Sequence, residues 1–173
     1  MTHHILTGAP GAGKTVILRG LERAGLAVVE EAATDVIAWA QATGDDAPWE
    51  RLDFTDTILA LQQQRQARAP AGPTIFDRSP VCTLALAHFL GLEPSAMLVT
   101  SAGACRDHYT RDVFFVESLP TIVNTAARRI SLDDALRFGA VHRQVYADLG
   151  FNLIDIPPAS PVERCDLVLS RLR

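Results

Sequence analysis

Short apolar runs alternate with longer stretches of helical spacing along this chain. Val113-Phe114-Phe115-Val116 is apolar without alternation, which is typical of a strand buried on both faces of a parallel sheet. Between such runs, apolar residues recur at helical intervals, as at Phe138, Val141, Val145 and Leu149. The strands predicted from this pattern are residues 4–7, 26–30, 74–77, 112–116 and 152–156.

Glycine, serine and proline mark where the intervening helices begin and end. Ser79-Pro80 and Ser160-Pro161 each combine an N-cap with a first-turn proline, and Glu163 completes a capping box with Ser160. Glycines expected to end helices in a left-handed conformation are Gly25, Gly44, Gly91 and Gly150. The element order β-α-β-α-α-β-α-α-β-α-β-α predicts an α/β fold with right-handed crossovers. Residues 1–173 contain no recognisable linker, so we expect one domain.

Composition narrows the class of protein. A chain of 173 residues with 48% hydrophobic and 21% charged residues is typical of a soluble globular domain. The net charge of −4 predicts no nucleic-acid or membrane partner, and no apolar stretch approaches the roughly 18 residues of a membrane span. The N-terminus lacks the features of a signal peptide, and the three widely spaced cysteines form no CxxC pair. These features predict a cytoplasmic protein with reduced thiols.

Residues 8–15 match the phosphate-binding pattern GxxxxGK[ST] in full. The glycines of this pattern let the backbone curl, so that successive N–H groups point inward as an anion nest. Lys14 is expected to reach the β- and γ-phosphates of ATP, and the Thr15 hydroxyl to ligate Mg²⁺. The expected nucleotide-binding residues are Gly8, Ala9, Pro10, Gly11, Ala12, Gly13, Lys14, Thr15 and Val16.

Lysine usage supports this interpretation. Of sixteen lysines and arginines, fifteen are arginines, so Lys14 is the only lysine in the chain. A compact ammonium group fits between phosphates where a planar guanidinium does not. The one lysine therefore stands at the position where phosphate chemistry requires it.

Charged residues are expected at the carboxyl ends of strands, where open α/β sheets bind ligands. Asp77 can hold Mg²⁺ through water or accept the proton of an acceptor hydroxyl, and Arg78 can clamp a phosphoryl group. Glu30 and Glu31 cannot both face one site from an extended segment, and we assign Glu31 to orienting or deprotonating the acceptor. The structural alternatives are a capping ion pair for Asp77 and Arg78 and a solvated helix N-terminus for Glu31.

Two further groups of residues are candidates for the site. Arg128 and Arg129 precede a predicted helix, where an arginine can close over the triphosphate and neutralise transition-state charge, and we prefer Arg128. Exposed surface arginines are the alternative for this pair. Trp39, Trp49 and Phe54 can line an acceptor pocket, although aromatic residues are more often part of the core.

Several motifs together resemble a known family. They are GAPGAGKT, VVEEAATDVI, IFDRSP followed by LALAHFLG, VFFVES, AARRISLDDA and VYADLGFNLIDIPPASPVERCDLVL. Over nearly its whole length the chain resembles the small P-loop kinase-like family, also described as AAA-type ATPase-like, that is related to the nicotinamide ribose kinase domain of NadR proteins. FDRS is also similar to the strand-end acidic–arginine pair of deoxynucleoside kinases.

The resemblance implies a three-layer P-loop fold, with a five-stranded parallel sheet in the order 2-3-1-4-5, an acceptor-side helical region and a lid. It assigns Lys14 and Thr15 to ATP and Mg²⁺. It assigns Asp77 and Arg78 to catalysis, and Arg128 to the lid. It also suggests that the loop around 157–159 lies near the adenine. Family members often carry an arginine shortly after the second-strand glutamate, where this chain has Thr34. A contact with a phosphate or carboxylate group of the acceptor is therefore expected to be missing.

The function predicted first is transfer of the ATP γ-phosphoryl group to a hydroxyl of a small molecule, which is nucleoside-like or of another kind. Its partners are a nucleoside triphosphate and an acceptor that the sequence does not identify. The alternative is a nucleotide-dependent switch or slow ATPase that acts through a protein partner. The chain lacks a clear apolar run ending in Asp-Glu, which favours that alternative over a robust ATPase.

Overall fold

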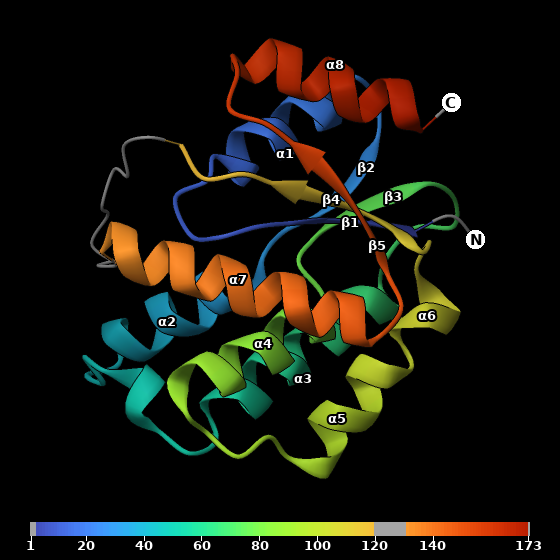
Figure 1. The fold of residues 1–173 in the computed structure, drawn as a ribbon. Coiled ribbons are helices and arrows are strands. Elements are labelled where there is room, and N and C mark those ends of the chain that lie inside the picture. Colours follow the sequence, from blue (N-terminus) through green and yellow to red (C-terminus); the bar gives the residue numbers. More distant parts are fainter. Residues whose placement is uncertain (1–2, 120–130, 173) are drawn as a thin grey trace.

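A five-stranded parallel sheet forms the centre of the fold (Figure 1). The computed structural model describes residues 3–119 and 131–172. The strands are β1 (His3–Thr7), β2 (Ala27–Val29), β3 (Thr74–Asp77), β4 (Asp112–Val116) and β5 (Asn152–Ile156). Their order is β2-β3-β1-β4-β5, which confirms the predicted topology. Strand β2 is shorter than predicted, because Glu31 already serves as the N-cap of the following helix.

Helices cover both faces of the sheet (Figure 1). On one face α1 (Lys14–Arg23) packs beside α8 (Pro161–Arg171). The other helices are α2 (Ala32–Ala42), the 3-10 turn η1 (Pro48–Glu50), α3 (Phe54–Ala67), α4 (Pro80–Leu90), α5 (Ala96–Gly103), α6 (Cys105–His108) and α7 (Leu132–Asp148). The short elements η1 and α6 are additions to the predicted order. Within the described residues, no helix has the length and apolar content needed to cross a membrane.

Neighbouring residues of the strands supply two separate cores. Ile5 and Phe76 belong to the core beneath α3, α4, α5 and α7, whereas Leu6 and Phe114 belong to the core beneath α1 and α8. Successive side chains of a strand point to opposite faces of a sheet, so both faces are buried when helices cover each of them. This arrangement explains why residues 113–116 of β4 are apolar without alternation.

The predicted helix ends are largely confirmed. Gly25, Gly44, Gly91 and Gly150 all have positive φ angles, and Ser160 forms a capping box with Glu163 at the start of α8. Ser79 occupies the N-cap position of α4 as predicted, but its side chain makes no capping hydrogen bond. The Ser79 hydroxyl instead lies 2.8 Å from the Tyr146 hydroxyl of α7, which joins the two helices under the sheet.

Candidate active site

The loop between β1 and α1 has the curled backbone that its motif predicts. Gly8, Gly11 and Gly13 have φ angles of 135°, 79° and 86°, a region that side chains other than glycine rarely adopt. Gly8 also lies close to β4, and a Cβ there would stand 2.2 Å from the Val116 carbonyl oxygen. The loop therefore requires glycine at this position for both conformation and space.

Replacing Gly8 with alanine should test this requirement against a matched control. We expect Gly8→Ala to lower the free energy of unfolding by at least about 3 kcal/mol, because backbone strain and overpacking add. Gly25→Ala introduces a side chain at a similarly positive φ of 92° but into open space, and should cost only about 1–2 kcal/mol. Urea unfolding of both variants measures the difference. Equal losses would show that the contact with β4 is unimportant.

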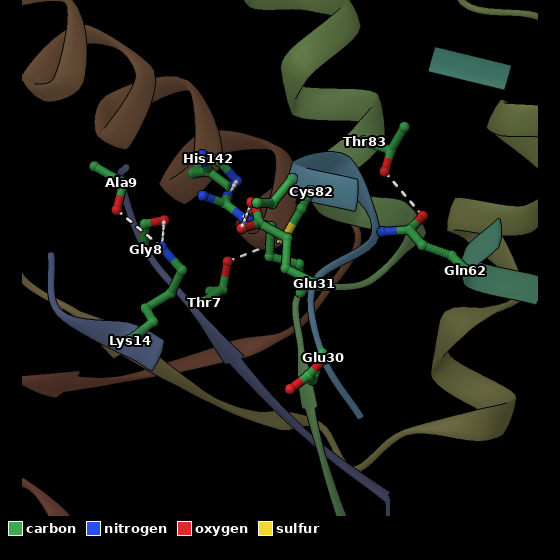
Figure 2. Close-up of polar contacts among 12 residues, drawn as sticks. Thr7, Gly8, Ala9, Lys14, Glu30, Glu31, Gln62, Cys82, Thr83 and His142 are labelled. Atoms are coloured by element: carbon green, nitrogen blue, oxygen red, sulfur yellow. Dashed lines mark hydrogen bonds and ion pairs between the residues drawn. The ribbon is translucent and has the colours of Figure 1, made fainter. Parts of the chain in front are cut away.

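Lys14, the first residue of α1, folds back onto the loop (Figure 2). Its Nζ donates hydrogen bonds to the carbonyl oxygens of Gly8, at 3.1 Å, and Ala9, at 3.0 Å. The side chain is only 4% exposed. Thr15 and Val16 follow Lys14 and are exposed residues. A helix N-terminus with backbone N–H groups beside one ammonium group is a suitable environment for phosphate.

Arg164 of α8 supports the loop from behind, a role that no sequence pattern indicated. Its guanidinium donates to the Ala12 carbonyl and to the Glu117 carbonyl, each at 2.9 Å, and the side chain is buried. Burial lowers the pKa of Arg164, while the Glu117 carboxylate opposes that shift. A Cβ on Gly13 would lie 3.2 Å from this guanidinium. Arg164 therefore joins the loop to α8 and to the end of β4.

Arg78 lies directly after β3 in a left-handed conformation, with a φ angle of 74°. It is the only non-glycine residue with a positive φ in the described part of the chain. Such a conformation costs on the order of 1–3 kcal/mol and is often found at functional sites. The Arg78 amide N–H donates to the Leu6 carbonyl at 3.0 Å, which holds the turn against β1.

The Arg78 side chain forms a buried ion pair with Glu31, with 2.5 Å between Nε and Oε1. Its Nη1 lies 3.3 Å from Nε2 of His142, whose Nδ1 is 3.2 Å from the Phe138 carbonyl. Burial and then the charge of Arg78 lower the pKa of His142 well below its usual value, so the imidazole is neutral. A neutral imidazole that donates from Nδ1 can accept from Arg78 at Nε2.

Burial opposes the charge of Arg78, but Glu31, and to a smaller extent Cys82 and Asp77, raise its pKa above the usual value. Arg78 is therefore a permanent cation at the base of the site. Asp77 is buried at the end of β3, in register with Leu6 of β1. Arg78 forms its ion pair with Glu31, which follows the neighbouring strand β2, and not with Asp77, which precedes it in the sequence.

Glu30 and Glu31 point in different directions, as predicted (Figure 2). Glu30 pairs with Arg19 at the surface, whereas the Glu31 side chain is 11% exposed. Thr34 donates from Oγ1 to Oε2 of Glu31 at 2.8 Å. The alternative of a solvated helix N-terminus does not describe Glu31, since its carboxylate is held inside by Arg78 and Thr34.

A pocket of about 740 Å³ opens beside these groups. Pro10 of the phosphate-binding loop lines the pocket together with Glu31 and Arg78. Its apolar wall includes Ile37, Phe54, Ile58, Leu86, Phe89 and Phe138, contributed by α2, α3, α4 and α7. The volume lies within the roughly 300–1,000 Å³ of small-molecule sites.

The three aromatic candidates lie in different surroundings. Trp49 and Phe54 line the pocket, and Phe54 is also part of a small core with Ile58. Trp39 is 73% exposed and does not line the pocket. Arg128 lies outside the described residues, so its place in a lid stays a prediction.

Comparisons with known proteins agree with this fold. Among solved structures, deoxyadenosine kinase from M. mycoides has a TM-score of 0.63 and 13% identity, covering 99% of this chain and 98% of that one. Shikimate kinase from Aquifex aeolicus has a TM-score of 0.59 and 12% identity, covering 99% and 96%. Thymidylate kinase from Ehrlichia chaffeensis has a TM-score of 0.56 and 13% identity, covering 100% of both chains.

Sequence comparison identifies the family directly. No curated protein sequence matches the chain. A family model described as an AAA domain matches residues 3–164, which is almost the whole chain. The predicted relation to the nicotinamide ribose kinase domain stays a prediction. The fold, the phosphate-binding loop and this match together show that the chain belongs to the AAA-domain family, with the P-loop kinase-like fold that its motifs predicted.

Proposed function

We propose that this protein transfers the γ-phosphoryl group of ATP to a hydroxyl group of a small molecule. The observation that carries the proposal is the pocket, which is lined by Pro10 of the phosphate-binding loop and by both members of the Arg78–Glu31 ion pair. A buried ion pair stabilises a fold little better than apolar residues of the same size would. Its position beside a pocket therefore favours a chemical role. The structural neighbours named above are all kinases, which supports the same function.

In this proposal the loop residues 8–16 hold the triphosphate through their backbone N–H groups, and Lys14 binds the β- and γ-phosphates. The hydroxyl of the exposed residue Thr15 and the Asp77 carboxylate, acting through water, would hold Mg²⁺. Both are oxygen donors, and oxygen is the ligand atom that this ion prefers. Bound Mg²⁺ would neutralise charge on the phosphate oxygens.

The transfer step uses the groups at the end of the pocket. The acceptor oxygen forms a bond to the γ-phosphorus, while the bond from that phosphorus to the β–γ bridging oxygen breaks and ADP leaves. We assign the acceptor proton to the Glu31 carboxylate, which lines the pocket. Arg78 stabilises the charge that develops on the transferred group, and Arg128 would add to this from the lid. Asp77, which does not line the pocket, is better suited to the metal.

The test is whether an acceptor accelerates ADP formation. We expect at least one member of a panel of nucleosides, including nicotinamide riboside, and other hydroxyl compounds to raise the rate over water by about 100-fold or more, because a bound, aligned hydroxyl gains from proximity. Coupled ADP detection with and without each compound measures this. A rate that no acceptor changes, but that a protein partner does, would favour the nucleotide-dependent switch.

A further inference from the structure

The charges around the acceptor pocket are unevenly distributed. Three carboxylate residues line it, Glu31 beside the loop and Asp46 and Asp134 from other segments. Arg78 is the only arginine or lysine that lines the pocket within the described residues. Asp134 is paired at 3.1 Å with Arg137, which does not line the pocket, so the described side chains around the pocket still carry more negative than positive charge.

The charge of Arg78 is also already matched inside the protein. Its Nε is paired with Glu31 and its Nη1 faces the neutral His142. Lys14, the next cation along the site, is turned toward carbonyl oxygens of its own loop and does not line the pocket. In the proposed reaction both cations are directed at the ATP phosphates. Of these two cations of the described residues, neither is left over to balance a phosphate or carboxylate on the acceptor.

The remaining polar groups of the pocket carry no charge. Thr83 of α4 donates from Oγ1 to Oε1 of Gln62 on α3 at 2.9 Å, which fixes the orientation of that amide (Figure 2). Thr34 lies near Glu31, and the wall between these groups is mostly apolar and aromatic. Amide and hydroxyl groups can satisfy a polar ring or sugar, but they compensate a buried anion poorly.

We propose that the acceptor is an uncharged hydroxyl compound with a ring-sized apolar body, and that the pocket rejects phosphorylated and carboxylated acceptors. The inference rests on the proposed phosphoryl transfer and specifies its substrate class. Among the described residues, the arginines at the pocket or beside it are already paired with carboxylates, Arg78 with Glu31 and Arg137 with Asp134. An acceptor anion would therefore lose its hydration on entering the pocket without gaining an unmatched cation from these residues, and it would approach the carboxylate that takes the acceptor proton.

Matched pairs of acceptors test this selectivity. Suitable pairs are methyl shikimate with shikimate and thymidine with thymidine 3′-monophosphate. The members of each pair differ by one anionic group, and both members of the second pair keep the 5′-hydroxyl as an acceptor. All reactions contain saturating ATP and Mg²⁺, so that the phosphate-binding loop is occupied and cannot bind the anion. We expect kcat/KM to favour the uncharged member by at least about ten-fold in every pair that reacts. Preference for the anionic member would overturn the inference while leaving phosphoryl transfer intact.

Two variants should change this preference in a defined direction. Thr34→Arg brings a guanidinium into the pocket, and should shift the ratio of kcat/KM values toward the anionic member by about ten-fold or more. Thr34→Gln is the matched control, because it adds length without charge and should leave the ratio unchanged. Asp46→Asn at the exposed rim should shift the ratio in the same direction by less, and does not disturb the interior.

Each outcome decides one of the two proposals. A shift produced equally by Thr34→Gln and Thr34→Arg, with none from Asp46→Asn, would show that shape and not charge sets the preference, and would overturn the inference. If neither member of any pair nor any compound of the wider panel is phosphorylated, although ATP binds, phosphoryl transfer itself fails and the inference fails with it.

Discussion

Replacing Lys14 with alanine should reduce ATP affinity by at least about 100-fold while the fold remains intact, because it removes the only ammonium group beside the loop. Nζ now contacts two loop carbonyls, and phosphate oxygens would replace them when ATP binds. Isothermal titration with ATP and Mg²⁺ measures the loss, and circular dichroism checks the fold.

Arg23→Ala is the matched control for this experiment. Arg23 lies on the same helix, at its exposed last turn. The Arg23→Ala variant should therefore bind ATP with the affinity of the unchanged protein. Lys14→Arg should also lose affinity, because a guanidinium does not fit between the phosphates. Tight ATP binding by Lys14→Ala would contradict our account of the loop.

Replacing Glu31 with glutamine should lower turnover by about 100-fold to 10,000-fold, the range expected when a general base is removed. The change keeps the shape of the side chain but removes the charge that accepts the acceptor proton. ATP binding should stay close to normal, because Glu31 lies at the end of the pocket and not in the phosphate-binding loop. Steady-state kinetics with a reacting acceptor and ATP titration separate the two effects.

Glu30→Gln supplies the control, since Glu30 precedes Glu31 but pairs with Arg19 at the surface. It should retain normal turnover. Glu31→Gln also leaves Arg78 without its carboxylate, so a loss of stability is expected and is measured separately by urea unfolding. Normal turnover in Glu31→Gln would remove this carboxylate from the reaction and leave Asp77 as the candidate base.

The framework of the fold followed from local sequence features. Residues 113–116 of β4 are an apolar run without alternation, which indicated a strand buried on both faces, and helices do cover both faces of the sheet. Left-handed glycines and the Ser160 capping box act within a few residues, so their signals are visible in the sequence. Only the small elements η1 and α6 were missed, because three or four residues are too few to show a period.

The site was predictable to the extent that its residues belong to motifs. The sequence singled out Lys14, which lies against the loop, and Arg78, which lines the pocket, and it preferred Glu31 over Glu30 because of side-chain alternation. Their roles in the reaction stay predictions. The partner of Arg78 was not predicted, although β2 and β3 are neighbours in the expected strand order, which brings Glu31 to the end of β3. His142 was not predicted, because it belongs to no recognisable motif in the sequence of α7.

Arg164 shows the main limit of sequence reasoning here. It donates to Ala12, which lies 152 positions earlier in the chain, and only the packing of α8 beside α1 brings the two together. The two tryptophans illustrate the same limit. Trp49 lines the pocket and Trp39 faces solvent, although neither is distinguished by its neighbours in the sequence.

The fate of the γ-phosphoryl group tests the central claim most directly. Phosphorus NMR of a reaction containing the protein, ATP, Mg²⁺ and an acceptor that accelerates ADP formation distinguishes a phosphate ester from inorganic phosphate. We predict a new ester resonance that grows in step with ADP and is lost in Glu31→Gln. Inorganic phosphate as the sole new product, formed at the same rate with and without the acceptor, would contradict the account.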